Sequence, residues 1–140
     1  MDKYLLSAAA VSVVSFYIAA RFHKKNRVKM AARQVVNDLI AKNALVVFSK
    51  TTCPYCQMVY SILVSDIKAE ARFVQLDKRK DGPLIQDVLQ EMTGSRSVPK
   101  VFVRGSFIGT GDDTRALYEN GKLVGILAKA GVKMAQESKL

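Results

Sequence analysis

The stretch SKTTCPYCQ at residues 49–57 contains both cysteines of this 140-residue chain, Cys53 and Cys56. Two thiols at this spacing can share a metal ion with other ligands, or they can exchange a disulfide with another molecule. A bridge between them would close only a very small loop, so it would add little chain-entropy stabilisation to the fold. We therefore expect the pair to serve in chemistry rather than in holding the fold together.

A metal site is disfavoured by the number of ligands. Structural zinc requires four cysteine or histidine ligands. Beyond the two cysteines the chain offers only His23, in the basic stretch RFHKKNR at residues 21–27. The sequence therefore predicts no metal site and favours redox exchange, for which C-x-x-C beside a βαβ pattern is the usual setting.

The chain divides into an N-terminal segment, residues 1–29, and a globular domain, residues 30–140. Residues 4–20 are uncharged and mostly apolar, and the basic run RFHKKNRVK follows them. Seventeen residues are at the short limit for a helix that spans a bilayer. A membrane anchor, a secretory signal peptide and a mitochondrial presequence all remain open for this segment.

The basic flank helps to choose among these alternatives. The positive-inside rule keeps such a flank on the cytosolic side, which places the globular domain in a reducing compartment suited to dithiols. We therefore predict membrane association through residues 4–20, with a cytosol-facing anchor. A mitochondrial location is the main alternative, and an internal start at Met30 would give a soluble cytosolic form.

The formal net charge of +10 does not indicate a nucleic-acid-binding protein. Half of it lies in residues 1–30, and the remainder is spread over the other 110 residues. Recognition of nucleic acid calls for a basic face with aromatic residues or a known motif. The sequence shows neither, so no nucleic-acid partner is expected.

From residue 30 onward, helical and strand patterns alternate. Residues 44–50 form a short apolar run typical of a buried strand, residues 72–77 read as a second strand, and residues 99–109 read as two strands around a turn at 104–106. Helical patterns cover residues 31–43, 57–67 with a start near Pro54, 82–94, and 113–131 with a break at Asn120-Gly121. This order predicts an α/β fold with a four-stranded mixed sheet flanked by helices. Its first two strands are parallel, and the hairpin is antiparallel on one edge.

The two cysteines are expected to have different roles. Pro54 suits the first position of a helix, so Cys53 should lie at the helix N-terminus, where free N–H groups and the helix dipole favour its thiolate. Lys50 adds a nearby positive charge. Cys56 lies one turn further in, where burial disfavours the ionised form. We therefore predict Cys53 as the nucleophile and Cys56 as the resolving thiol.

Three separated motifs, in this order along the chain, resemble those of the glutaredoxins. They are CPYC at 53–56 with Lys50 three positions before it, SVP at 97–99, and GTGDD at 109–113. The resemblance covers roughly residues 30–132. It implies a thioredoxin fold and a glutathione-disulfide oxidoreductase that carries out deglutathionylation and protein disulfide reduction. Glutathione would be a co-substrate, with no tightly bound cofactor.

The resemblance also implies a glutathione site. Val98 and Pro99 match the family's cis-proline loop, in which the valine backbone pairs with the cysteinyl part of glutathione. Lys50 and Gln86 match the positions that hold the glycine carboxylate. Glutathionylated or disulfide-bonded proteins are the implied partners.

The γ-glutamyl end of glutathione is implied to lie at residues 111–113. Gly111 and Asp112 match the residues that bind it, with Asp113 beside them, and Tyr55 matches an aromatic residue that flanks the thiolate. The sequence departs from the family pattern here, because Thr110 interrupts the usual Gly-Gly and Gly111 replaces a bulkier residue.

Other functions remain open. A thioredoxin-like reductant served by a reductase usually has Gly-Pro between its cysteines, where this chain has Pro54 and Tyr55. A membrane-tethered redox sensor or scaffold would explain the N-terminal segment. An iron–sulfur carrier is a further alternative, although Pro54 and the second thiol Cys56 point away from it.

Overall fold

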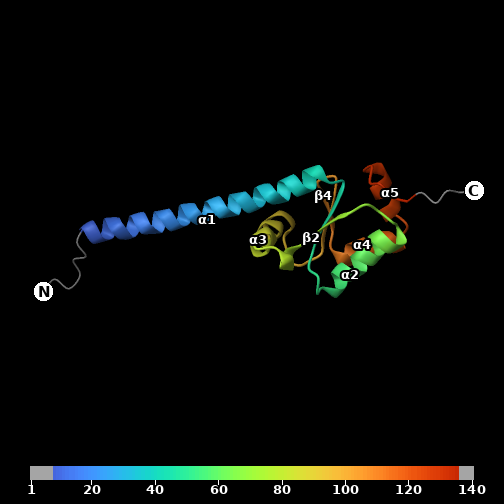
Figure 1. Ribbon diagram of the computed structural model, residues 1–140, viewed down its shortest axis with the longest axis horizontal. Coiled ribbons are helices and arrows are strands. Elements are labelled where there is room, and N and C mark those ends of the chain that lie inside the picture. The colour runs from blue at the N-terminus through green and yellow to red at the C-terminus, as the bar shows by residue number, and fades with distance from the viewer. Residues whose placement is uncertain (1–7, 136–140) are drawn as a thin grey trace, which may run out of the picture. The chain divides into compact units, whose positions relative to one another are not determined.

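The computed structural model describes residues 8–135 of the chain (Figure 1). The chain forms two compact units, Met1–Ala31 and Ala32–Leu140. The elements in chain order are α1 (Ala8–Lys42), β1 (Leu45–Ser49), α2 (Pro54–Tyr60), the π-helical segment η1 (Ser61–Asp66), β2 (Arg72–Gln75), the short 3₁₀ segment η2 (Leu76–Lys78), α3 (Gly82–Thr93), β3 (Lys100–Val103), β4 (Ser106–Gly109), α4 (Gly111–Glu119) and α5 (Leu123–Lys129).

Helix α1 differs from the sequence prediction. A helix was predicted over residues 31–43, but a single helix runs from Ala8 to Lys42 and also includes the basic run and most of the apolar run. No glycine or proline occurs between these residues, and alanine, lysine and arginine are good helix formers. The helix ends at Lys42, and the side-chain amide of the next residue, Asn43, donates to the carbonyl oxygen of Leu39 at 2.8 Å.

Residues 8–20 of the predicted membrane anchor lie in α1. Within residues 8–135, no helix has the length and apolar character needed to cross a membrane. Residues 4–7 of the predicted anchor lie outside the described part of the chain. The large apolar side chains that α1 carries before Ala31, such as Phe16 and Phe22, are exposed.

The sheet confirms the predicted mixed four-stranded topology. The strand order is β2-β1-β3-β4, with β1 parallel to β2 and antiparallel to β3, and with β3 antiparallel to β4. Arg104 and Gly105 connect β3 to β4 with φ angles of 47° and 80°. Positive φ at both central residues is the conformation of the two-residue hairpin turn that matches strand twist.

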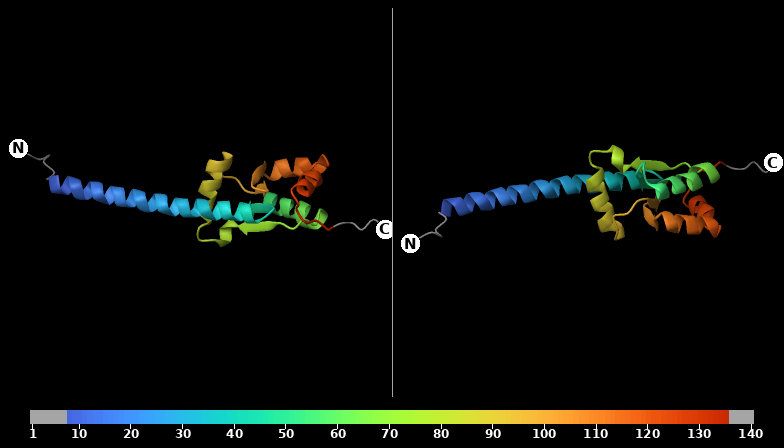
Figure 2. Two further views of the ribbon diagram at one scale, coloured as in Figure 1. Left: turned by 90° about the horizontal axis from the view of Figure 1, so that it is seen from above. Right: turned by 90° about the horizontal axis from the view of Figure 1, so that it is seen from below.

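Side chains of β1 alternate between two core layers, so the whole strand is buried. Leu45 and Val47 belong to the layer that includes residues of α2, η1 and α5. Val46 and Phe48 belong to the layer that includes α3 and the last turns of α1. Helix α2 lies beside α4 (Figure 2). The central strand β1 is therefore fixed on both faces, and it leads directly into the cysteine turn.

Most predicted helix limits are confirmed. Helix α2 begins at Pro54, α3 has proline in its first turn and Gly94 at its C-terminal cap, and a break at Asn120-Gly121 separates α4 from α5. The π-helical end of the cysteine helix was not predicted, since the apolar spacing of residues 57–67 fits an ordinary α-helix.

Candidate active site

Cys53 lies at the N-terminus of α2, as predicted. It is the N-cap residue, with φ −90° and ψ 118°, and Pro54 follows it in the first turn. The backbone N–H of Cys56 donates to the Cys53 sulfur at 3.4 Å, and the Cys53 thiol donates to the carbonyl oxygen of Val98 at 3.7 Å. The half-buried Cys53 sulfur therefore faces the positive end of the helix on one side and the α3–β3 loop on the other.

Cys56 is in a different environment. Its side chain is only 4% exposed. Burial, followed by the hydrogen bond with Cys53, raises the pKa of the Cys56 thiol from 9.0 to about 12. The neutral thiol is thus the stable form of Cys56 at physiological pH, while Cys53 is the more accessible sulfur. The roles of nucleophile and resolving thiol stay a prediction, which this difference in environment motivates.

Alkylation tests this difference. A pKa raised to about 12 leaves Cys56 protonated until the pH approaches that value. At pH 8 only on the order of one Cys56 in ten thousand would be ionised. Iodoacetamide at pH 8 should therefore modify the reduced native protein at Cys53 alone, as read by mass spectrometry of the digested protein. Protein unfolded in guanidinium is the control and should be modified at both positions. Equal labelling of both cysteines in the native protein would contradict the assignment.

The loop that faces Cys53 has the features implied by the sequence. The peptide bond between Val98 and Pro99 is cis. Gln86 was predicted to hold a glutathione carboxylate, but its side chain is buried and donates to the carbonyl oxygen of Arg96 at 2.7 Å. In this structure Gln86 thus fastens the loop to α3.

Lys100 also fastens the loop, a role that sequence reasoning missed. Its side chain is fully buried, and its ammonium donates to the hydroxyls of Ser95 at 2.6 Å and Ser97 at 3.0 Å. Burial lowers the pKa of Lys100, and the charge of Asp113 opposes this shift. The ammonium also lies 5.8 Å from the ring centre of Phe107. The only signal in the sequence is a lysine directly after Ser-Val-Pro, in a strand otherwise apolar.

Residues 110–113 form the start of α4. Thr110 is the N-cap residue, and it forms a capping box with Asp113. The Asp113 carboxylate accepts from the Thr110 backbone N–H at 2.8 Å. Asp112 is exposed and pairs with Arg115 at 3.1 Å. The departure from the family pattern at Thr110 therefore supplies a helix cap.

Gly111 allows close contact between α4 and the cysteine helix. A Cβ atom at Gly111 would lie 3.2 Å from the Cβ of Tyr55, tighter than ordinary van der Waals contact. Tyr55 itself is exposed. The structure therefore brings the cysteine turn next to both the Val98 loop and the start of α4. Lys50 lies on the cysteine turn, and its carbonyl oxygen accepts from the Cys53 N–H at 3.3 Å.

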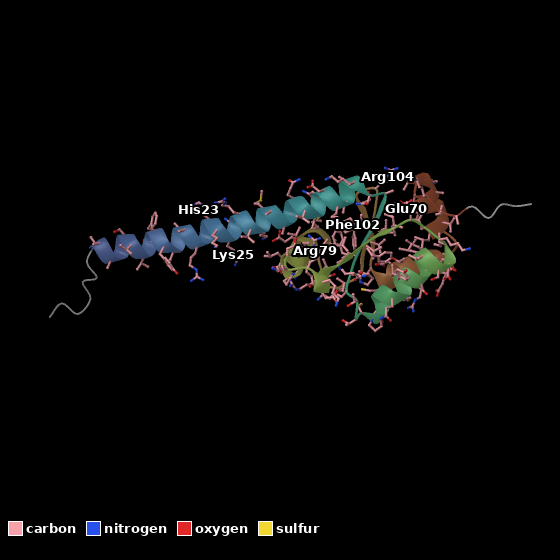
Figure 3. All side chains as sticks on the ribbon, in the orientation of Figure 1. His23, Lys25, Glu70, Arg79, Phe102 and Arg104 are labelled. Carbon is pink, nitrogen blue, oxygen red and sulfur yellow. The ribbon has the colours of Figure 1, made fainter. Side chains whose placement is uncertain are left out.

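Metal ligands are not grouped in the part of the chain that the structure describes. No three histidine, cysteine, aspartate or glutamate side chains among residues 8–135 are arranged to hold an ion. His23 lies on α1, in the first compact unit (Figure 3).

A half-buried thiol at a helix N-terminus, beside a cis-proline loop and on a mixed four-stranded sheet, defines a thiol–disulfide oxidoreductase of the thioredoxin fold. The glutaredoxin family model matches residues 45–108. A glutaredoxin from Vernicia fordii is 42% identical over 98 residues, which are 70% of this chain and 93% of that protein. The chain therefore belongs to the glutaredoxin family.

Other relatives agree with this membership. Mouse glutaredoxin-2, named as mitochondrial, is 39% identical over 104 residues, covering 74% of this chain and 66% of that protein. The crystal structure of a buckwheat glutaredoxin–glutathione complex has a TM-score of 0.71 and 39% identity. It covers 75% of this chain and 94% of that chain.

Proposed function

We propose that this glutaredoxin is a glutathione-dependent oxidoreductase that removes glutathione from mixed disulfides and also reduces protein disulfides. The observation that carries the proposal is the contrast between the two thiols. Cys53 is half-buried at the start of a helix, while Cys56 is buried and its pKa is raised to about 12. The buckwheat relative solved as a glutathione complex supports glutathione as the ligand.

Deglutathionylation requires only Cys53. The Cys53 thiolate attacks the glutathione sulfur of a mixed disulfide, the S–S bond breaks, and the substrate leaves as a thiolate that takes up a proton. A free glutathione thiolate then attacks the glutathione sulfur bound to Cys53. Oxidised glutathione leaves with the new S–S bond, and Cys53 returns as a thiolate. The incoming glutathione is the reductant: its sulfur is oxidised to the disulfide level while the substrate sulfur is reduced to a thiol, and the transferred glutathione stays at the disulfide level throughout.

Reduction of a protein disulfide requires both thiols. Cys53 attacks one sulfur of the substrate and forms a mixed disulfide. The Cys56 thiol then loses its proton and attacks the Cys53 sulfur, which releases the reduced substrate and leaves an intramolecular disulfide. Two glutathione molecules reduce that disulfide in turn. Burial of Cys56 protects this thiol from side reactions between turnovers.

The surroundings of Cys53 suit glutathione, which is an anionic peptide. Lys50 provides a cation for one carboxylate, and the N–H groups at Gly111 and Asp112 provide donors for the other. The backbone at Val98, before Pro99, offers an edge with which the peptide can pair. Tyr55 and Asp113 flank the proposed path of glutathione. Gln86 supports this path indirectly, because its hydrogen bond to the Arg96 carbonyl holds the loop that carries Val98.

Turnover of a glutathionylated substrate by the purified full chain tests the proposal. Activity with glutathione, glutathione reductase and NADPH is the expected result. Activity only with thioredoxin reductase would favour a thioredoxin-like reductant. Absence of turnover with either reductase would favour a redox sensor or scaffold, or an iron–sulfur carrier.

We place this reaction in a reducing compartment, because both thiols must return to the reduced state after each cycle. The mouse relative named as mitochondrial supports a mitochondrial location, which stands beside the soluble cytosolic form. Fractionation of cells that express the tagged chain separates these alternatives, and recovery in the secretory lumen would exclude both.

A further inference from the structure

A pocket of about 230 Å³ lies beside the active-site cysteines, between α2 and the edge strand β2. Its lining includes Lys50, Cys56, Gln57, Tyr60, Phe73 and Gln75. Of these residues, the reaction described above uses only Lys50 and Cys56. The others are assigned no step in it.

The sheet topology separates this pocket from the glutathione residues. Strand β1 carries the cysteine turn at its end and lies between β2 and β3. Val98 directly precedes β3 and Gly111 follows β4, so both lie on one side of β1. Phe73 and Gln75 belong to β2, on the other side. The pocket therefore lies across the cysteine turn from the glutathione path, and Lys50, at the end of β1, is common to both.

The lining combines an aromatic wall with polar groups. The rings of Tyr60 and Phe73 are in contact, with centroids 5.1 Å apart, and Tyr60 remains 50% exposed. The side-chain oxygen of Gln75 accepts from Ser49 at 2.8 Å. The exposed side of Tyr60 offers a face on which another aromatic ring can stack.

The charge around the pocket is positive. Lys50 is a cation in its lining, and none of the lining residues within the described chain is acidic. Asp77 is close by and carries a negative charge, because hydrogen bonds from Thr51 lower the pKa of its carboxyl, but the cations around it outnumber it. Arg72, Lys78 and Lys80 are exposed on and just after β2. A ligand that carries a carboxylate beside an aromatic ring therefore fits this surface best.

We propose that the pocket is a subsite for protein disulfide substrates, which takes an aromatic side chain next to an acidic one in the polypeptide flanking the substrate cysteine. The inference rests on the protein-reducing half of the proposed function. Cys56 lines the pocket, so the pocket is continuous with the reaction centre. A chain joined to Cys53 by a mixed disulfide can extend across the cysteine turn to β2. Glutathione, placed on the β3 side, does not need this surface.

Two disulfide peptides of equal length test the proposal. Each has one intramolecular disulfide, with Glu-Phe flanking its cysteines in the acidic peptide and Lys-Phe in the basic one. The reduced full chain is mixed with each peptide in a single turnover without glutathione, and the reduced peptide is measured by mass spectrometry after acid quenching. The wild type should reduce the acidic peptide faster.

Loss of the Tyr60 ring from the aromatic wall should slow reduction of the acidic peptide but not deglutathionylation. Tyr60→Ala should slow reduction of the acidic peptide about fivefold, the scale of one aromatic contact. The same variant should keep wild-type turnover of a small glutathionylated substrate. Tyr60→Phe keeps the ring and should behave as wild type. Equal rates of Tyr60→Ala and wild type with the acidic peptide would overturn the proposal.

A charge placed in the pocket gives a second test that does not depend on the ring. Gln57→Glu should reverse the preference, so that the basic peptide is reduced faster. Both peptides react with the same Cys53, so the ratio of their rates cancels any effect of the new charge on that thiol. Gln90→Glu makes the same change on the exposed face of α3 and should leave the ratio unchanged.

The outcomes separate the pocket from the proposed function. A wild-type chain that reduces both peptides equally, or a Gln57→Glu ratio that matches Gln90→Glu, would overturn the pocket assignment while glutathione turnover stands. Failure to turn over the glutathionylated substrate would instead reject the proposed function. The single-turnover peptide ratio would still decide the role of the pocket, because that assay contains no glutathione.

Discussion

Replacing Cys53 with serine should abolish both activities of this protein, whereas replacing Cys56 with serine should abolish only one. In Cys53→Ser no accessible nucleophile remains, because Cys56 is buried and its pKa is raised to about 12. In Cys56→Ser the first thiol remains, and free glutathione can resolve the glutathione mixed disulfide on Cys53. Deglutathionylation should then stay within about threefold of wild type, since its two exchange steps involve Cys53 alone.

With a disulfide-bonded protein as substrate, the Cys56→Ser variant should differ from wild type by accumulating a mixed disulfide. Without Cys56, the mixed disulfide between Cys53 and a protein substrate has no internal attacking thiol. The Cys56→Ser variant should therefore accumulate this mixed disulfide, which appears as a higher-mass band on a non-reducing gel. The measurements are steady-state rates with a glutathionylated substrate and with a disulfide-bonded protein. Equal loss of deglutathionylation in the two variants would show that the roles are not divided as proposed.

The sequence predicts the framework of the site because its signals are local. Pro54 sets the start of α2, and this start places Cys53 at the N-cap. A short apolar run identifies β1, and the glycine turn at 104–106 identifies the hairpin. Each of these signals depends on a few consecutive residues, so tertiary contacts do not need to be known.

The parts that were missed depend on contacts between distant segments. Lys100 looked like an ordinary strand residue and Gln86 was assigned only to glutathione, yet both side chains are buried and hold the same loop. The pocket beside Cys56 joins α2 to β2, whose residues are separated in sequence from the cysteine turn. The length of α1 was also missed, because a change from apolar to basic residues does not end a helix that lacks glycine and proline.

Replacing Gly109 with alanine should be the most damaging of the glycine substitutions near the site. Gly109 has φ +134°, a conformation that residues with a side chain rarely adopt. A Cβ atom there would lie 2.3 Å from the Cβ of Asp113, the residue that completes the capping box of α4. Strain and overlap together should lower the free energy of unfolding by about 2–5 kcal/mol.

The same substitution should also weaken glutathione binding, because displacement of Asp113 moves the start of α4, where the γ-glutamyl end is proposed to bind. Gly105→Ala is the matched control. Gly105 also has a positive φ, +80°, but no atom lies within 4 Å of the added Cβ, so only the conformational cost of about 1 kcal/mol is expected. Urea denaturation gives the unfolding free energies, and the KM for a glutathionylated substrate reports on the site. Equal destabilisation of the two variants would show that overlap with Asp113 adds nothing to the loss of stability caused by the positive φ angle. An unchanged KM in folded Gly109→Ala would show that glutathione does not depend on the start of α4.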